Sequence, residues 1–329
     1  MPDNVVGSHA PVCNMSSFHL ATLATAECAH ELALLHESVR AFHPPESVPL
    51  VVGCSTELMA AVEADESLRG LRDDAAIHWV PCLDQYKAID RAAMEAQPGV
   101  WYPTRHCDFM MEKANVMELA LQKMELGATA SARTSPTSLP PGVLYVDSDI
   151  VFLESLESMF VRPVGTTEET PIIAGVSPHY ILPRDEALFG KYNGGVLFAS
   201  HPVVLWHWRR ATQVSRYFDQ ASIEDVVEAV EASEGAAAVR RFGPHVNYGF
   251  WRLFQQERGV ADEVSRFSIN GTSGIVYAGS PLHSVHTHWC MKTRCREIPV
   301  FNELVRGWIR RAQSLNPGLY PGLRRIAAL

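Results

Sequence analysis

Long apolar runs are missing from this chain of 329 residues. No stretch approaches the ~20 apolar residues that a membrane-spanning helix needs, and the most apolar one, residues 143–153, is interrupted by two aspartates. No basic residue precedes Arg40, so the start of the sequence does not have the charge pattern of a secretory signal. We therefore expect a cytoplasmic protein; a lumenal location of the Golgi type would require an upstream anchor that has been removed.

Cysteine and positive charge are also scarce. The seven cysteines are an odd number without the spacing of a disulfide framework, so we expect reduced thiols. Lys and Arg number 28 against 37 Asp and Glu, and the formal net charge of −9 argues against a general nucleic-acid binder. With 47% apolar and 20% charged residues and no internal repeat or long linker, the chain has the composition of a single globular domain.

Strand and helix patterns alternate in the first half of the chain. Apolar runs of strand length alternate with segments that carry apolar residues at helical spacing, which is typical of an α/β fold with a mostly parallel sheet flanked by helices. The expected strands are 18–25, 49–54, 77–81 and 142–146, and the expected helices are 31–42, 56–64 and 109–126. Residues 127–141, rich in Ala, Ser, Thr and Pro, are expected to be a loop insertion.

Two aspartates follow the last of these strands. The segment Gly-Val-Leu-Tyr-Val-Asp147-Ser148-Asp149-Ile-Val-Phe-Leu runs from an apolar strand directly into two carboxylates and then becomes apolar again. Side chains two apart on an extended chain point the same way, and the carboxyl edge of such a sheet is where ligands bind. Carboxylate oxygens there suit Mg(II) or Mn(II). Alternatively, one aspartate caps a following helix and the other is solvated.

This Asp-x-Asp after an apolar strand resembles the signature of metal-dependent, nucleotide-sugar-using glycosyltransferases of the GT-A fold. Further motifs resemble glycosyltransferase family 8, the glycogenin and lipopolysaccharide galactosyltransferase group. Thr22-Leu23-Ala-Thr25 is similar to the family's opening strand, and the resemblance implies that Leu23 and Thr25 line the nucleotide pocket, with Ser148 beside them at the donor site. Lys113 resembles the family's donor-contacting lysine, although a solvated helix position would also account for it.

Two later motifs belong to the same resemblance. Asn193-Gly194-Gly195-Val is similar to the element that supports the transferred sugar, and glycines there would allow the backbone to approach a ligand closely. A plain turn into a strand would have the same sequence. Asp219-Gln220 falls where the family has an Asp-Gln pair near the anomeric carbon. The resemblance thus implies catalytic roles for Asn193, Asp219 and Gln220.

The last motif contains histidines. In Leu282-His-Ser-Val-His286-Thr-His288-Trp-Cys-Met-Lys292, the spacing of His286 and Lys292 matches a family motif whose histidine binds the metal and whose lysine contacts the diphosphate. The implied metal ligands are Asp147, Asp149 and His286, with His288 and Lys292 at the donor site. The family's glycine after the histidine is Trp289 here, and its Pro-Trp after the lysine is residues 293–294, Thr-Arg.

The histidine segment also permits two other interpretations. Imidazole and thiolate are the ligands that zinc prefers, so His283, His286, His288, Cys290 and Cys295 could form a structural zinc site, although a Cys-x-x-Cys pair is missing. His288 could instead be a hydrogen-bonded core histidine.

Aromatic residues and the chain end complete the sequence pattern. We expect at least two of Trp206, Trp208 and Trp251 in the core. From Lys292 onward there are eight basic and two acidic residues, so residues 293–329 form a basic tail. Its apolar stripe, at helical spacing, could contact an anionic membrane, or it could pack on the protein's own core, which we favour. The stripe comprises Phe301, Leu304, Val305, Trp308 and Ile309.

Together these features predict one GT-A domain over residues 18–292, with a nucleotide-binding half (18–150) and a sugar and acceptor half (151–292). The implied activity is metal-dependent transfer of a sugar from a nucleotide sugar, a UDP-sugar, to a hydroxyl of a glycan, protein or lipid, with retention of configuration. A non-catalytic nucleotide-sugar or glycan-binding protein is the alternative. A nucleotidyltransferase is disfavoured because no Gly-rich phosphate loop follows the first strand.

Overall fold

The computed structural model describes residues 17–86, 104–128, 139–161, 170–289 and 295–323. Among these residues, no helix combines the length and the apolar character that crossing a membrane requires. Cys54 and Cys107 are buried thiols, in agreement with the expected reduced state.

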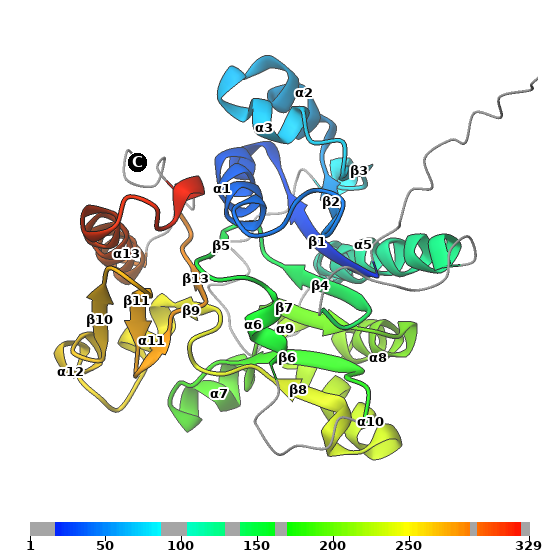
Figure 1. Ribbon diagram of the computed structural model, residues 1–329. Coiled ribbons are helices and arrows are strands. Elements are labelled where there is room, and N and C mark those ends of the chain that lie inside the picture. Colours follow the sequence, from blue (N-terminus) through cyan, green and yellow to red (C-terminus); the bar gives the residue numbers. More distant parts are fainter. Residues whose placement is uncertain (1–16, 87–103, 129–138, 162–169, 290–294, 324–329) are drawn as a thin grey trace, which may run out of the picture.

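A seven-stranded mixed sheet forms the centre of the molecule (Figure 1). Its strand order is β3-β2-β1-β4-β7-β6-β8. The first four strands run parallel, β7 is antiparallel to both β4 and β6, and β8 is parallel to β6. The strands are β1 (Phe18–Ala24), β2 (Leu50–Cys54), β3 (Ile77–Pro81), β4 (Gly142–Val146), β6 (Ala174–Pro178), β7 (Tyr192–Ala199) and β8 (Val239–Arg241). The predicted α/β class with a mixed, mostly parallel sheet is confirmed.

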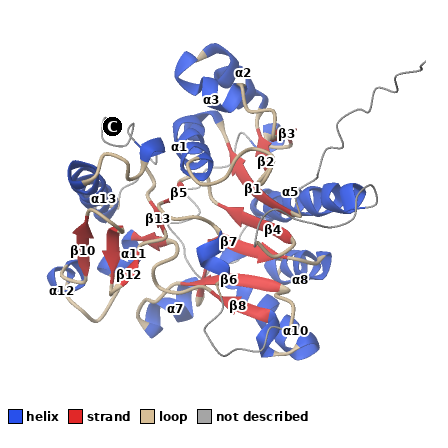
Figure 2. Ribbon diagram, in the orientation of Figure 1, coloured by secondary structure: helices blue, strands red, loops and turns tan. Residues whose placement is uncertain are grey.

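Helices cover both faces of this sheet (Figure 2). Successive strand residues contribute to opposite cores, as Leu144 and Tyr145 do on β4, because side chains alternate along a strand. One core includes α1 (Ala29–Arg40), α2 (Thr56–Ala64), α3 (Arg69–Arg72) and α6 (Glu157–Phe160). The other includes α5 (Thr104–Ala128), α8 (Pro202–Thr212) and α10 (Ile223–Glu234). The short helix α7 (Pro183–Phe189) precedes β7 in the chain, and the short helix α9 (Phe218–Ala221) lies between α8 and α10.

The predicted elements of the first half agree closely with the structure. Strands 77–81 and 142–146 and helix 56–64 have the predicted bounds, whereas helix 31–42 is shifted to 29–40 and helix 109–126 extends over 104–128. Most of the expected loop insertion lies outside the described residues. Trp208 and Trp251 are buried and Trp206 is 52% exposed, so the prediction that at least two are core residues is confirmed.

Two three-stranded sheets extend the molecule beyond the central sheet. In one, β13 (Ser284–His286) lies between β5 (Ile150–Phe152) and β9 (Tyr248–Gly249). His286 is paired with Ile150 on one side and Gly249 on the other, so this sheet brings three distant segments to one place. The other sheet contains β10 (Phe267–Asn270), β11 (Gly274–Tyr277) and β12 (Ser280–Pro281), and α11 (Phe250–Phe254) and α12 (Val260–Val264) precede it.

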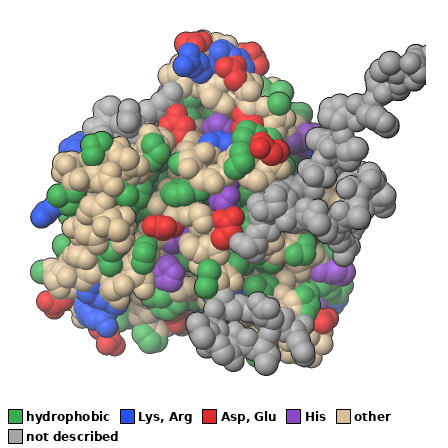
Figure 3. Space-filling model, in the orientation of Figure 1, with side chains coloured by type: hydrophobic (Ala, Val, Ile, Leu, Met, Phe, Trp, Pro, Cys, Tyr) green, Lys and Arg blue, Asp and Glu red, His purple; other side chains and the backbone are tan. Residues whose placement is uncertain are grey.

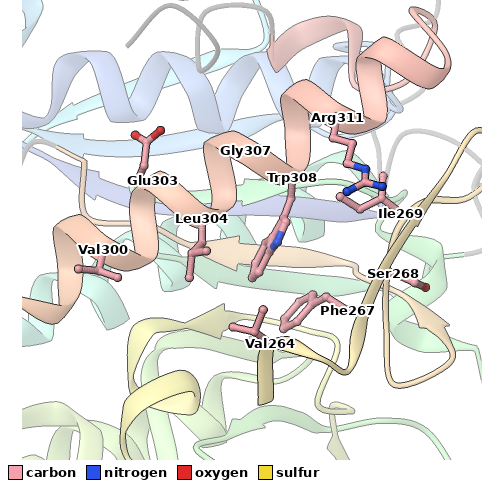
Figure 4. Close-up of a pocket in the computed structure, with 10 residues that line it drawn as sticks. All are labelled: Val264, Phe267, Ser268, Ile269, Val300, Glu303, Leu304, Gly307, Trp308 and Arg311. Atoms are coloured by element: carbon pink, nitrogen blue, oxygen red, sulfur yellow. The ribbon is translucent and has the colours of Figure 1, made fainter. Parts of the chain in front are cut away.

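The tail forms helix α13 (Glu297–Leu315), whose apolar stripe packs on the protein itself. Phe301, Val305 and Ile309 are fully buried, and the Trp308 ring stacks on Phe267 with 4.1 Å between ring centroids. The preferred interpretation of the stripe, packing on the protein's own core, is confirmed. An open groove of about 820 Å³ remains along the helix, with Leu304 and Trp308 from α13 facing Val264 and Phe267 (Figure 4).

Candidate metal and donor site

The two aspartates of the Asp-x-Asp motif lie in a turn between β4 and β5. Asp147 follows the last residue of β4, and the backbone N–H of Ile150 donates to the Asp147 carbonyl at 3.1 Å. This turn, rather than the alternation of an extended chain, directs both carboxylates to one atom, since Asp149 Oδ1 lies 2.9 Å and Asp147 Oδ2 3.9 Å from His286 Nε2. The alternative in which one aspartate caps a following helix is wrong, because strand β5 follows.

Two histidines complete this cluster. His286 is the last residue of β13, and His288 follows with a positive φ of 55°. The Nδ1 atom of His288 contacts Asp149 Oδ2. Ligand atoms of Asp149, His286 and His288 all lie within 4.8 Å of one another. His288, which the resemblance had implied only for the donor site, therefore lies among the candidate metal ligands, and Asp147 lies at their edge. Figure 3 shows acidic and histidine side chains near the centre of the face that is drawn.

The cluster contains buried polar atoms without hydrogen bonds. Within the described part of the chain, neither Asp149 Oδ1 nor His286 Nε2 has a hydrogen-bond partner, although only 2.9 Å separates them. Buried lone pairs that face each other in this way are costly unless a proton or cation lies between them.

Lys113 lies next to this cluster and links Asp147 to a further carboxylate, that of Asp219. Its ammonium group lies 2.9 Å from Asp219 Oδ2 and 3.3 Å from Asp147 Oδ1, and it donates to the Gly194 carbonyl at 3.1 Å. Burial would lower the pKa of Lys113, but the two carboxylates raise it, so the group is charged at neutral pH. Tyr145 also donates to Asp147 Oδ1, at 2.9 Å. The solvated position considered for Lys113 is wrong, because the residue is buried.

The glycine pair on β7 lies directly against the cluster. A Cβ atom added to Gly195 would be 2.7 Å from both Asp147 Oδ2 and His286 Cε1, so only glycine fits there. The N–H of Gly195 donates to Asn193 Oδ1 at 2.9 Å, and that of Gly194 donates to Gln220 Oε1 at 3.2 Å. The structure thus brings Asn193, Gly194, Gly195, Asp219 and Gln220 together beside Asp147.

Leu23 and Thr25 lie at the carboxyl end of β1, the strand that pairs in parallel with β4. Leu23 packs over Gly53, where an added Cβ would be 2.4 Å from Leu23 Cδ2. Thr25 precedes a 3-10 helix at residues 26–28 and donates to Cys28 Sγ at 3.9 Å. Ser148 is buried in the turn between the two aspartates. Lys292 lies outside the described residues, as do Cys290 and residues 293–294.

The zinc interpretation is wrong for His283. Its Nε2 lies 3.0 Å from the Ser155 carbonyl, and its ring packs edge-on against Phe152, so it is not a member of the Asp149 cluster. Burial lowers the pKa of His283 to about 3, which keeps the ring neutral. The Cys295 thiol instead contacts Glu297 Oε2 at 3.1 Å. The metal-ligating group of the described residues combines one carboxylate and two imidazoles and contains no thiolate.

Sequence reasoning missed the roles of Asn247 and His179. Asn247 Oδ1 lies 3.0 Å from His286 Nδ1, and His179 Nε2 lies 3.3 Å from Asn193 Nδ2. Both residues are buried, and Asn247 has a φ of 55°, a conformation that asparagine tolerates better than most residues. The sequence carries no local signal for these contacts, because each joins segments far apart in the chain.

Comparison with known proteins gives matches among solved structures. No family model and no curated protein matches this chain. A complex of galactosyltransferase LgtC with donor and acceptor sugar analogues matches at 15% identity with a TM-score of 0.44, covering 91% of this chain and 96% of that one. Mouse xyloside xylosyltransferase 1 matches at 11% identity with a TM-score of 0.44, and the match covers 85% of this chain and 98% of that one. A glycosyltransferase involved in glycosylation of the major capsid of PBCV-1 matches at 11% identity with a TM-score of 0.43, and the match covers 86% of this chain and 98% of that one.

These matched structures are glycosyltransferases. At these identities and TM-scores the likeness supports no conclusion about the activity of this chain. The chemistry of this chain is therefore inferred from its own site residues.

Proposed function

We propose that this protein is a metal-dependent glycosyltransferase that transfers a sugar from a nucleotide-sugar donor, a UDP-sugar, to a hydroxyl acceptor. The observation that carries the proposal is the pair of buried, unbonded ligand atoms on Asp149 and His286, within reach of His288 and Asp147. The cluster lies beside the carboxyl ends of parallel strands, where α/β folds bind their ligands. The acceptor is a glycan, protein or lipid hydroxyl.

The donor set suits Mn(II) or Mg(II). Carboxylate oxygens with imidazole nitrogen fit Mn(II), whereas a structural zinc site would be expected to include thiolates. When bound, such a cation would neutralise the charge that develops on the departing nucleoside diphosphate. Asp149, His286 and His288 would hold it, with Asp147 beside them.

Lys113 orients the carboxylates of the site in this proposal, in place of the donor contact that the resemblance implied. Its ammonium group donates a hydrogen bond to the Gly194 carbonyl and forms ion pairs with Asp147 and Asp219. Burial raises the pKa of the Asp219 carboxyl, and the positive charge of Lys113 opposes that rise. Asp219 and Gln220, held against Gly194, lie where they can position the acceptor and the transferred sugar, and positioning supplies much of the rate in such reactions. Retention of configuration is proposed on the family resemblance.

The test is thermal unfolding with nucleoside diphosphates, in the presence and absence of Mn(II). A ligand at about 100 times its Kd stabilises the folded state by roughly 2.7 kcal/mol, enough to raise Tm by several degrees. We expect UDP to raise Tm of the wild type only with Mn(II), and to have no effect on Asp149→Asn. Asp225→Asn, at an exposed position on α10, is the matched control and should behave as the wild type.

Two results would contradict the proposal. Stabilisation by UDP without metal, or equal stabilisation of Asp149→Asn, would show that the cluster is not the donor site. If Mn(II) and UDP bind but no UDP is released from any UDP-sugar in the presence of acceptors or water, the non-catalytic binding protein is the correct alternative.

A further inference from the structure

A continuous chain of hydrogen bonds leads from the backbone of Gly190, between α7 and β7, to His286 in the candidate metal site. It begins at the Gly190 carbonyl, 2.7 Å from His179 Nδ1. His179 Nε2 lies 3.3 Å from Asn193 Nδ2, Asn193 Oδ1 lies 3.0 Å from Asn247 Nδ2, and Asn247 Oδ1 lies 3.0 Å from His286 Nδ1. Its four side chains are at most 6% exposed, so solvent does not substitute for these bonds.

Two backbone groups fix the direction of every bond in this chain. The Gly190 carbonyl can only accept, so His179 carries its proton on Nδ1 and its Nε2 accepts from Asn193. Independently, the Gly195 N–H can only donate, at 2.9 Å, so the Asn193 atom facing it is the oxygen. Both ends give Asn193 the same amide orientation. Burial lowers the pKa of His179 to about 4, so its ring is neutral and able to accept near pH 7.

The same direction continues to His286. Because Asn193 presents its oxygen, the Asn247 atom facing it is the NH2 group, which donates at 3.0 Å. The other Asn247 atom is then the oxygen, which accepts from His286 Nδ1. The backbone of Asn247 is itself held by a hydrogen bond from its N–H to Ser284 Oγ, at 2.8 Å.

We propose that Asn247 and Asn193 are positioning residues that keep the proton of His286 on Nδ1, so that the Nε2 lone pair is directed at the bound cation beside Asp149. This inference rests on the proposed function, because it concerns the metal of that site. The proposal gives Asn193 a positioning role within the protein instead of the sugar contact that the resemblance implied. The Asn193 oxygen already accepts from the Gly195 N–H and from Asn247 Nδ2. The Asn193 NH2 group faces His179 and Gln220. Bonds of this kind orient the ring and raise its basicity as a ligand.

The first test measures Mn(II) binding to the purified protein by electron paramagnetic resonance of the free ion. Asn247→Gly removes the side chain but tolerates the positive φ, and we expect Mn(II) affinity roughly 10- to 100-fold lower. Asn247→Asp also tolerates this φ and still presents an oxygen to His286 Nδ1, so it should recover several-fold of the lost affinity. The matched control is Ser177→Ala. Ser177 Oγ also accepts from Asn247 Nδ2, at 3.2 Å, but it is not part of the hydrogen-bond chain that leads to His286. We expect this variant to bind Mn(II) with wild-type affinity.

The second test observes the wild-type protein directly and uses a variant only to assign its signals. Long-range nitrogen–proton correlation spectra of histidine-labelled wild type report which ring nitrogen carries the proton, and the loss of signals in His286→Gln identifies His286. We expect a protonated Nδ1 on His286 and a change at Nε2 when diamagnetic Mg(II) is added. A His286 ring without a proton on Nδ1 would overturn the inference.

These results separate failure of the inference from failure of the proposed function. If the wild type binds Mn(II) through Asp149 but Asn247→Gly binds it equally well, the positioning role is wrong and the metal site remains. If the wild type does not bind Mn(II), the proposed function fails, while the spectra still decide whether the hydrogen-bond chain fixes the His286 proton.

Discussion

Replacing Lys113 with methionine tests how much the Lys113 ammonium group contributes to the stability of the folded state by pairing with the buried Asp219 carboxylate. Lys113 is 7% exposed, and its ammonium group lies 2.9 Å from Asp219 Oδ2, which is buried as well. Methionine preserves most of the volume but leaves a buried carboxylate without its cation. Breaking a buried pair in this way costs about 3–5 kcal/mol. At ~2–4 °C per kcal/mol, Tm should fall by roughly 6–20 °C.

The pH dependence of this loss has a defined sign. Burial raises the pKa of Asp219 even beside Lys113, and removal of the cation raises that pKa further. A carboxyl group whose folded-state pKa exceeds its unfolded value makes the folded state more stable as pH falls through the raised pKa. The difference in Tm between wild type and Lys113→Met should therefore be smaller near about pH 5 than near about pH 8.

The assay is calorimetric or fluorescence-monitored thermal unfolding, with chelator present so that metal does not contribute. Lys123→Met, further along α5, is the matched control and should change Tm little, because Lys123 has no ion pair with a carboxylate in the described residues. Lys113→Met combined with Asp219→Asn should recover much of the lost stability, since the uncompensated charge is gone. A Tm for Lys113→Met within about 2 °C of the wild type would refute the reasoning.

Two further predictions concern other parts of the structure. In Gly195→Ala the new methyl group would meet Asp147 Oδ2 and His286 Cε1 at 2.7 Å, so we expect about 1–3 kcal/mol lower unfolding free energy and weaker Mn(II) binding, by denaturant titration and paramagnetic resonance. Desolvation by burial would raise the pKa of Glu263, but hydrogen bonds, including one at 2.5 Å from Tyr277, hold that pKa below 4.5. The stability that ionised Glu263 contributes is therefore present above pH 4.5 and is lost as pH falls through the lowered pKa. Glu263→Gln should make unfolding free energy less dependent on pH in this acid range.

Controls for these two predictions are available in the same chain. Gly259→Ala should have little effect, because an added Cβ there meets nothing within 4 Å. Glu228→Gln changes an exposed carboxylate on α10 and should leave the acid dependence of stability unchanged. Equal effects of Gly195→Ala and Gly259→Ala would contradict the close approach of β7 to the cluster. A steep acid dependence retained in Glu263→Gln would assign that dependence to other groups.

The sequence by itself determined the elements and several members of the site. Local periodicity gave the bounds of β3, β4 and α2, because alternation along a strand and helical spacing depend only on neighbouring residues. Two aspartates interrupting an apolar strand, and histidines two apart near the end, marked the residues that meet in the cluster of Asp149, His286 and His288.

Only the tertiary structure decided which distant residues form hydrogen bonds and ion pairs with the side chains of this site. Strand β13 pairs with β5 on one side and β9 on the other, and this pairing brings Asn247 to His286, 39 residues away in the chain. The tertiary structure also buries Lys113 between Asp147 and Asp219, whereas the sequence left open a solvated position on its helix. Pairing between distant strands is set by the packing of the whole domain, so a single sequence read in short windows contains the ligands but not the hydrogen bonds that orient them.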